Sequence, residues 1–279
     1  MTATEPFGEL LAGVLARFGR LCVGIDPHSA LLASWGLPDT AAGAREFGIR
    51  VVDATAGRAA IVKPQVAFFE RHGSAGYAAL EDVLAAARAA DLLVIADVKR
   101  GDIGSTVDAA GEAWLEPGSP LEADAMTAVA YQGLGSLDPV FERADRHGKG
   151  VFVLAATSNP EGIETQRAVR ADGLTVAGGL AADVARRNAG RALGSIGLVI
   201  GATGSLADAG IDAGALAHTP ILAPGFGHQG ARIANGPVVF GGVTQNVLVS
   251  VSRSILQAGP DGVAESIASA AQEVAAWQL

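Results

Sequence analysis

The strongest constraint on the fold is a series of eight short apolar runs spread along the 279-residue chain. Most of them are continuously apolar rather than alternating, which is typical of strands buried on both faces of a parallel sheet. The segments between them are rich in alanine and have helical spacing, so strand and helix alternate. The runs begin roughly 24 to 45 residues apart, at Leu21, Ala60, Leu92, Ala125, Val151, Ile196, Pro220 and Val247.

Helices are predicted in the segments that separate these runs. An amphipathic helix is predicted before the first strand. Ser136 and Asp261 are candidate N-caps of two later helices, because both side chains can accept a hydrogen bond from a helix amide. The other predicted helices span residues 40–57, 77–90, 181–193 and 204–217.

Eight strand–helix units predict an α/β protein of the (β/α)8 TIM barrel class, with an N-terminal helix and an inserted loop after the fifth strand. A doubly wound sheet is the alternative, because the number of strands is uncertain from one sequence. No linker or low-complexity segment divides the chain, so we expect residues 1–279 to form one domain. We expect the inserted loop, residues 158–178, to form a short ribbon or a lid.

Composition narrows the classes of function. The net charge of −9 and the 5% aromatic content argue against nucleic-acid binding. The single cysteine, Cys22, excludes an internal disulfide and fits a reducing compartment. The acidic start is not typical of a signal peptide, and no apolar run reaches the length of a membrane span. We therefore expect a cytoplasmic protein with neither a nucleic-acid nor a membrane partner.

Polar residues gather where the predicted strands end. In a barrel the carboxyl ends of the strands form one rim, and active sites lie there. This convergence favours a functional site over unrelated structural ion pairs. The rim is predicted to carry Asp26, His28, Lys63, Gln65, Asp97, Lys99, Asp102, Thr157, Ser158, Asn159, Ser252 and Arg253.

The densest charge cluster surrounds the third strand. Asp97 and Lys99 are two residues apart and project to the same side of that strand. Opposite charges at the end of an apolar strand are costly unless they pair or take part in chemistry, so a structural ion pair is the alternative. Lys63, within an apolar strand, could be a snorkelling lysine, a partner of Asp97 or a Schiff-base lysine. Neighbouring carboxylates disfavour the last, because they keep lysines protonated and an imine requires a neutral amine.

The loop after the seventh strand matches the pattern G-x-G-x-x-G at residues 225–230. A dinucleotide site would need an acidic residue about 20 positions later, and no Asp or Glu occurs between Asp212 and Asp261. Glycine amides, His218, His228, Arg232 and Arg253 in this segment instead predict a phosphate site. The alternative is a tight turn with a surface arginine. No histidines have metal-ligand spacing, so no metal site is predicted.

Several blocks in order resemble one family, the orotidine 5′-phosphate decarboxylases, and in particular its longer bacterial branch. The spacing Asp97-x-Lys99-x-x-Asp102 with Lys63 upstream carries the resemblance, together with DVKRGDIGST and TSNPEG. The match extends to VGIDPH, KPQVAFFE, PGFGHQG and SRSI.

The resemblance implies a carboxy-lyase that converts orotidine 5′-phosphate to UMP and CO2 without a cofactor, in de novo pyrimidine biosynthesis. It implies that Lys99 protonates a carbanion at C6 of the pyrimidine, which fixed charges stabilise. The implied charge array consists of Lys63, Asp97, Lys99 and Asp102.

The resemblance also implies the substrate contacts and a homodimer. Asp26 would bind the ribose hydroxyls, Ser158 the pyrimidine amide, and Gln229 and Arg253 the phosphate. Asp102, Ile103 and Thr106 would reach into the partner subunit's site. Some relatives have a phosphate-binding Tyr where this chain has Ala231, so further phosphate contacts must come from elsewhere.

Two other functions fit parts of the pattern. A sugar-phosphate decarboxylase or aldolase of the same barrel superfamily would share Asp-x-Lys-x-x-Asp, but those relatives carry a metal-binding Glu near the position of Lys63. A non-catalytic phosphate-binding barrel is the second alternative, and the intact four-residue array argues against it.

Overall fold

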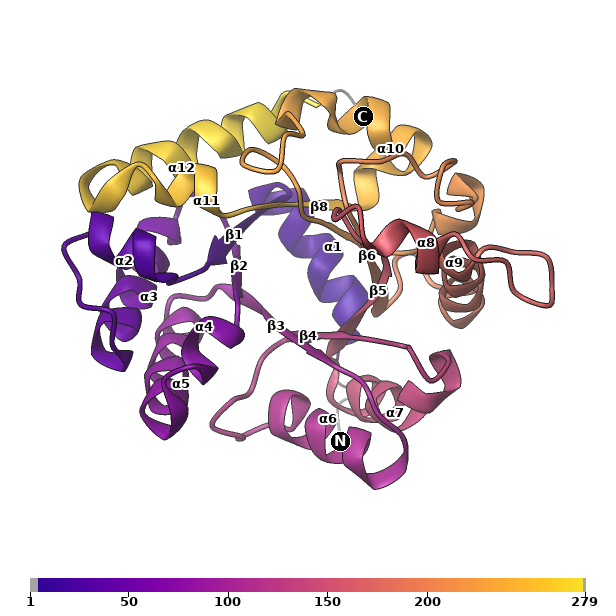
Figure 1. Cartoon of the computed structure of the whole chain (residues 1–279), viewed down its shortest axis with the longest axis horizontal. Coiled ribbons are helices and arrows are strands. Elements are labelled where there is room, and N and C mark those ends of the chain that lie inside the picture. Colours follow the sequence, from indigo (N-terminus) through magenta and orange to yellow (C-terminus); the bar gives the residue numbers. More distant parts are fainter. Residues whose placement is uncertain (1–4, 278–279) are drawn as a thin grey trace.

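The computed structural model describes residues 5–277 and shows eight parallel strands closed into a barrel in the order β1 to β8 (Figure 1). All eight predicted strands are confirmed. The doubly wound alternative is wrong, because β8 pairs with β1, with Val251 opposite Val23. The strands are β1 (Leu21–Ile25), β2 (Ile61–Pro64), β3 (Leu93–Arg100), β4 (Ala125–Ala128), β5 (Gly150–Ala156), β6 (Ile196–Ile200), β7 (Ile221–Ala223) and β8 (Val247–Val251).

Helices surround the barrel on its outside (Figure 1). The longer ones are α3 (Ala41–Thr55), α5 (Gly73–Ala89), α6 (Gly104–Leu115), α7 (Asp138–His147), α9 (Val176–Arg187) and α12 (Gly259–Ala275). Shorter helices are α2 (Ser29–Ser34), α4 (Ala67–Glu70), α8 (Gly162–Gln166), α10 (Gly236–Phe240) and α11 (Arg253–Leu256). Four 3-10 turns are η1 (Leu134–Leu137), η2 (Ala213–Leu216), η3 (Ile233–Asn235) and η4 (Gly241–Asn246). None of the described helices is long and apolar enough to cross a membrane.

Both faces of the strands are buried, which explains the continuous apolar runs. Alternate residues such as Val62 and Val94 face outward into the layer between strands and helices. The residues between them, such as Ile61 and Leu93, belong to a separate cluster inside the barrel. Complete burial of each such side chain contributes about 1.5–3 kcal/mol, so the two layers together favour closure.

Helix α1 (Phe7–Phe18) lies across the barrel interior behind the strands in Figure 1. Phe7 and Leu11 are fully buried in the interior cluster, and the ring of Phe7 meets that of Phe152 edge-on at 6.1 Å. Gly150 makes room for this helix, because a Cβ there would lie 2.4 Å from the Phe7 ring. The predicted N-terminal helix is therefore confirmed, and it closes the end of the barrel at which the strands begin.

The predicted helix at residues 40–57 is confirmed, because Thr40 caps α3 by accepting a hydrogen bond from the Gly43 amide at 3.2 Å. Two other predicted helices are present with shifted bounds. Helix α5 begins at Gly73, before the predicted start at 77. Helix α9 begins at Val176, where Thr175 accepts from Gly178, and it ends at Arg187.

The predicted helix at residues 204–217 is wrong, because only the short turn η2 forms there. Gly210 has φ +71°, a conformation outside the right-handed helix, and Asp212 accepts a hydrogen bond from Gly214 at 2.9 Å. Glycine and a short acidic side chain therefore stabilise turns in place of a helix.

Both predicted N-caps in the later helices are also wrong. The Ser136 hydroxyl donates to the Gly133 carbonyl within η1, and α7 begins at Asp138. Helix α12 begins at Gly259, with Pro260 in its first turn, where the fixed φ of proline is favourable. Asp261 consequently lies inside the first turn, where its charge still favours the helix.

The inserted segment after β5 contains α8 and a short antiparallel ribbon in which Val169 pairs with Thr175. Arg170 ties the ribbon to α9 through Asp183 at 3.0 Å. The ribbon projects outward beside α9 (Figure 1). Of the two predicted forms, the ribbon is the one observed.

The α1 packing predicts that Phe7→Ala lowers the free energy of unfolding by about 3–5 kcal/mol, because a buried ring is replaced by a cavity. Phe18→Ala is the matched control, since Phe18 lies on the same helix and is 44% exposed, and we expect a change below about 1 kcal/mol there. Urea denaturation measures both variants. Equal losses in the two would contradict a specific role for Phe7 in closing the barrel.

Candidate active site

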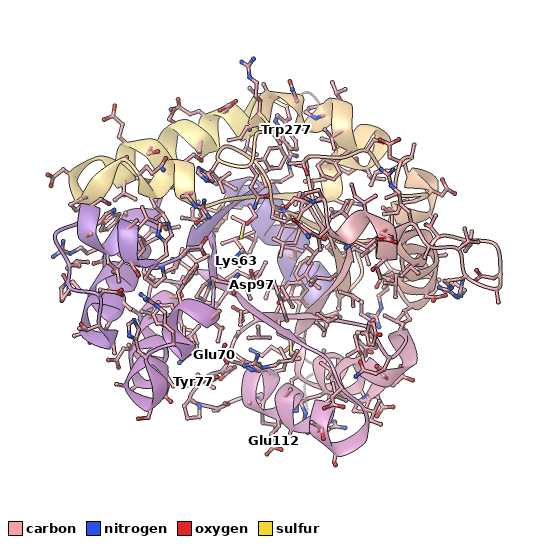
Figure 2. All side chains as sticks on the ribbon, in the orientation of Figure 1. Lys63, Glu70, Tyr77, Asp97, Glu112 and Trp277 are labelled. Carbon is pink, nitrogen blue, oxygen red and sulfur yellow. The ribbon has the colours of Figure 1, made fainter. Side chains whose placement is uncertain are left out.

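A cavity of about 350 Å3 opens at the carboxyl ends of the strands. Lys63 and Asp97 lie near the centre of the barrel, whereas Glu70 and Tyr77 lie toward its periphery (Figure 2). The cavity brings together most of the residues that the sequence predicted at the rim and in the phosphate site, from β2, β3 and the segments after β1, β2, β5, β7 and β8. These residues are Asp26, Lys63, Gln65, Asp97, Lys99, Thr157, Ser158, Asn159, His228, Gln229, Ser252 and Arg253.

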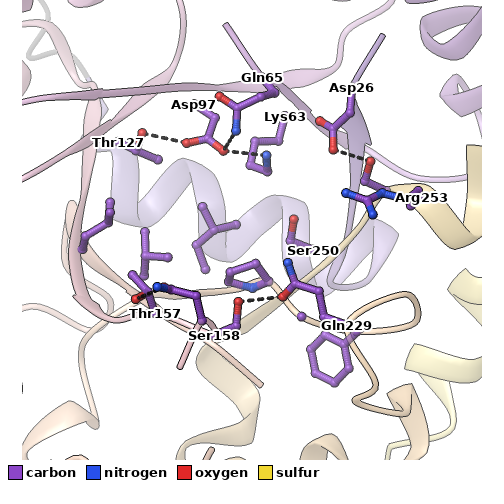
Figure 3. Close-up of a pocket in the computed structure, with 18 of the residues that line it drawn as sticks. Asp26, Lys63, Gln65, Asp97, Thr127, Thr157, Ser158, Gln229, Ser250 and Arg253 are labelled. Carbon is purple, nitrogen blue, oxygen red and sulfur yellow. Dashed lines mark hydrogen bonds and ion pairs between the residues drawn. The ribbon is translucent and has the colours of Figure 1, made fainter. Parts of the chain in front are cut away.

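The Asp97 carboxylate is the centre of the charge array (Figure 3). Its Oδ2 accepts hydrogen bonds from Lys63 Nζ and Gln65 Nε2, each at 2.8 Å. Its Oδ1 accepts from Lys99 Nζ at 2.6 Å and from the Thr127 hydroxyl at 3.0 Å. Four donors, from β2 and the residue after it, from β3 and from β4, therefore hold one carboxylate in a single orientation.

Burial and neighbouring charges shift the pKa values of Asp97 and Lys63 in opposite directions. Burial alone would raise the pKa of Asp97, but the ammonium groups of Lys63 and Lys99 hold it well below its ordinary value. Burial alone would lower the pKa of Lys63, but the carboxylates of Asp97 and Asp26 raise it above its ordinary value. Both groups are therefore ionised at neutral pH, which removes the neutral amine that a Schiff-base lysine needs.

Asp26 lies at the end of β1 and lines the same cavity. Its Oδ2 accepts a hydrogen bond from the Ser252 hydroxyl at 2.5 Å. Its Oδ1 is buried and has no hydrogen-bond partner among the described residues. A buried carboxylate oxygen without a partner is costly, so this atom is suited to accept a hydrogen bond from a ligand hydroxyl.

Ser158 and Gln229 lie across the cavity from Asp97, and Arg253 lies between Gln229 and Asp26 (Figure 3). The Ser158 hydroxyl donates to Gln229 Oε1 at 2.6 Å, so these two loops are joined across the cavity mouth. The loop also brings His228 to the cavity. An arginine and side-chain amides are suited to bind a phosphate or carboxylate.

Part of the predicted phosphate site is wrong. The amides of Gly227, Gly230 and Ala231 donate to carbonyl groups within the loop, so these three do not point at a ligand. Gly225, Gly227 and Gly230 have φ between +76° and +107°, as this tight turn requires. His218 is also misplaced by the sequence prediction, since its ring contacts the Ala192 carbonyl.

Three predicted site residues lie outside the cavity of their own chain. Asp102 follows β3 and its carboxylate accepts from the Ile103 amide at 2.9 Å. Ile103 is 60% exposed, and Thr106 is exposed on the first turn of α6. His28, at the predicted rim, does not line the cavity either, because its ring caps α2 by accepting from Leu31.

The sequence predicts Gln65 only as a rim residue and does not identify Thr127, although both contact Asp97. Strand parity could have indicated both contacts. Gln65 is two residues after Lys63, and Thr127 is two residues after the inward-facing Ala125, so both point into the barrel.

Comparisons with known proteins agree with this geometry. The sequence profile of the orotidine 5′-phosphate decarboxylase / HUMPS family matches residues 19–267. A Salinispora tropica relative named orotidine 5′-phosphate decarboxylase is 52% identical over 261 residues, covering 93% of each chain. A Streptomyces coelicolor relative of the same name is 52% identical over 261 residues, covering 92% of each chain.

The chain belongs to the orotidine 5′-phosphate decarboxylase / HUMPS family.

Solved structures of proteins assigned to this family have the same barrel. A Streptomyces avermitilis protein assigned the decarboxylase name superposes with a TM-score of 0.94 at 49% identity, covering 99% of this chain and 96% of its own. The Leishmania donovani OMP decarboxylase superposes with a TM-score of 0.76 at 32% identity, covering 96% of this chain and 98% of its own. The predicted family and fold are therefore confirmed. The predicted enzyme class, a carboxy-lyase, is confirmed as well, because the relatives are named orotidine 5′-phosphate decarboxylase.

The depressed pKa of Asp97 predicts a pH-dependent contribution to stability. The unfolded chain protonates Asp97 near pH 4, above the folded value, so the contribution is complete above about pH 4 and declines by about 1.4 kcal/mol per pH unit below it. We expect Asp97→Asn to lose about 3–5 kcal/mol at pH 7, because Lys63 is left buried with less compensation.

Urea denaturation of wild type and variant between pH 7 and pH 3 measures this difference. The exposed Asp53 of α3 offers a control, and Asp53→Asn should change stability by less than about 0.5 kcal/mol. A wild-type advantage over Asp97→Asn that stays constant from pH 7 to pH 3 would show that Asp97 is not held ionised by its lysine partners.

Proposed function

We propose that this enzyme converts orotidine 5′-phosphate to UMP and CO2, as the names of its relatives indicate, and that it does so without a cofactor. The observation that carries the proposal is the position of Asp97 between two ammonium groups, 2.8 Å from Lys63 and 2.6 Å from Lys99. This array lies in the same cavity as Arg253 and Gln229.

The two ends of the cavity suggest how the substrate is oriented. Arg253 and Gln229 bind the phosphate, and Ser158, which already contacts Gln229, reaches the pyrimidine amide. The unpartnered oxygen of Asp26 accepts from a ribose hydroxyl, with Lys63 close enough to respond to the charge of Asp26. This orientation directs the C6 carboxylate of the pyrimidine toward Lys99 and Asp97.

Decarboxylation breaks the bond between C6 and its carboxylate carbon and leaves the electron pair on C6. The Lys99 ammonium stabilises this carbanion electrostatically and then transfers a proton to C6, which gives UMP. CO2 leaves, and Lys99 regains its proton from water. The side chain of Lys99 is 44% exposed before substrate binds, so reprotonation is accessible.

Asp97 contributes by fixing charge before the reaction starts. Its carboxylate orients Lys63 and Lys99, so little reorganisation is needed when negative charge develops at C6. It also lies where the substrate carboxylate must approach, and it disfavours that group more than the carbanion that replaces it. Phosphate binding at the far end of the cavity supplies the free energy that holds the substrate there.

The site is proposed to be shared between two subunits of a homodimer. Asp102, Ile103 and Thr106 do not line the cavity of their own chain, yet they follow directly on the strand that carries Asp97 and Lys99. Residues on the rim of one barrel can reach a neighbouring barrel across a two-fold axis. Asp102 then completes the alternating array from the partner.

The sugar-phosphate alternative is disfavoured by Lys63. A metal site needs a carboxylate ligand at this place, whereas the structure places a buried ammonium group there, paired with Asp97.

The proposal is tested by incubating the purified protein with orotidine 5′-phosphate in EDTA and following the loss of the orotate chromophore. We expect full turnover in EDTA. Absence of turnover would overturn the proposed function, and turnover that requires a divalent cation would favour the sugar-phosphate alternative.

Lys99→Ala is expected to lower kcat by at least about 10³-fold, because the proton donor and the main carbanion-stabilising charge are both removed. Affinity for UMP, measured by isothermal titration calorimetry, should be retained through the phosphate contacts. Arg58→Ala, at an exposed cation after α3, should keep the wild-type rate. A near-wild-type kcat in Lys99→Ala would show that another group delivers the proton.

Mixed dimers test the shared site. Refolding Lys99→Ala together with Asp102→Ala should restore one of the two sites in each hybrid dimer, or about half the wild-type activity per hybrid. Mixing Lys99→Ala with Lys63→Ala is the matched control, and no activity should return because both residues serve their own subunit. Hybrids of the first pair that form but remain inactive would place Asp102 outside the partner's site.

A further inference from the structure

We propose that Thr127 of β4 is a positioning residue of the decarboxylase, which holds the backbone of Lys99 and the carboxylate of Asp97 in their reactive arrangement. The inference rests on the proposed function, in which Lys99 delivers the proton.

The Thr127 hydroxyl is engaged on both sides. It donates to Asp97 Oδ1 at 3.0 Å and accepts from the Lys99 backbone amide at 2.9 Å. Thr127 is 1% exposed, so water does not compete for these bonds. The donor and one acceptor position of the hydroxyl are used within the protein, which makes this group a support for the array and not a ligand for substrate.

The backbone of Lys99 needs such a support. Lys99 has φ +49°, in the left-handed region that a side chain disfavours by about 1–2 kcal/mol. The strand pairing is irregular at the same place: Ala96 lies opposite Met126, but Arg100 lies opposite Ala128. Three residues of β3, from Asp97 to Lys99, therefore lie opposite the single residue Thr127 of β4 in this bulge, and the displaced Lys99 amide donates to the Thr127 side chain.

The bulge explains how neighbouring positions on one strand can act as an ion pair. Lys99 Nζ contacts Asp97 Oδ1, which is the same oxygen that Thr127 contacts, while Lys63 and Gln65 take Oδ2. The Thr127 hydroxyl, the Asp97 carboxylate and Lys99 thus form a closed ring of hydrogen bonds (Figure 3 draws the bond from Thr127 to Asp97).

Loss of the hydroxyl would act on the proton donor and leave the phosphate end intact. The Lys99 amide would lose its partner, which favours relaxation of φ toward negative values, and Nζ would move with the backbone. A displacement of about 1 Å can cost about 100-fold in rate. Arg253 begins α11 and Gln229 lies in the loop after β7, so both are on other segments and substrate affinity should change little.

The test is Thr127→Val, which keeps the shape of the side chain and removes the hydroxyl. We expect kcat to fall about 10–100-fold, with KM for orotidine 5′-phosphate within about 3-fold of wild type. Thr127→Ser keeps the hydroxyl and should recover kcat to within about 5-fold of wild type. Thr55→Val is the matched control, because Thr55 is fully buried and donates to the Val51 carbonyl in α3; it should lose comparable stability and keep kcat.

A second readout does not depend on activity. Hydrogen exchange of the Lys99 amide should be at least about 10-fold faster in Thr127→Val than in wild type, because its acceptor is gone. Unchanged exchange, or a Thr127→Val kcat within about 2-fold of wild type, would overturn the positioning role. A wild-type protein without turnover would overturn the proposed function instead, and the exchange result would still decide whether Thr127 holds Lys99.

Discussion

One carboxylate shared by two ammonium groups is the interaction on which the rest of the site depends. A buried Asp97 or Lys63 alone would cost several kcal/mol, and neither would remain charged. Together, and with hydrogen bonds from Gln65 and Thr127, the charges are retained in fixed positions. The arrangement is suited to a reaction in which charge moves from a leaving carboxylate to a ring carbon.

The barrel can hold this buried charge cluster because the apolar contacts that stabilise the fold and the polar residues of the active site lie at opposite ends. At the end where the strands begin, Phe7 and Leu11 of α1 fill the interior with apolar contacts. At the other end, the strand termini and their loops carry polar side chains around one cavity. Because parallel strands all end on the same side, residues from distant parts of the chain meet there without any long-range signal in the sequence.

Much of the fold was predictable because the apolar runs of strands and the helical spacing of apolar residues are both properties of short segments of sequence. Eight apolar runs predict eight strands, and spacing at the helical period predicts α3 and the body of α5. The wrong helix and N-cap predictions have a common cause, which is that local interactions compete with the helical pattern. Ser136 donates within a 3-10 turn and does not cap α7, Pro260 allows α12 to begin before Asp261, and glycines between residues 204 and 217 favour turns. In each case a nearby hydrogen bond or a backbone preference outweighed the general helical pattern.

The sequence by itself determined the barrel, the family and the positions of Lys63, Asp97 and Lys99, because strand period and residue spacing are local properties. Only the tertiary structure decided the rest. The role of Thr127 depends on the register between β3 and β4, and the left-handed conformation of Lys99 depends on the same bulge. Several amides of the Gly-rich loop donate to carbonyl groups of the loop itself, and side chains of this loop line the cavity. The first two features arise from the register between β3 and β4, which no single window of sequence encodes, and the third arises from hydrogen bonds that form only once the loop has folded.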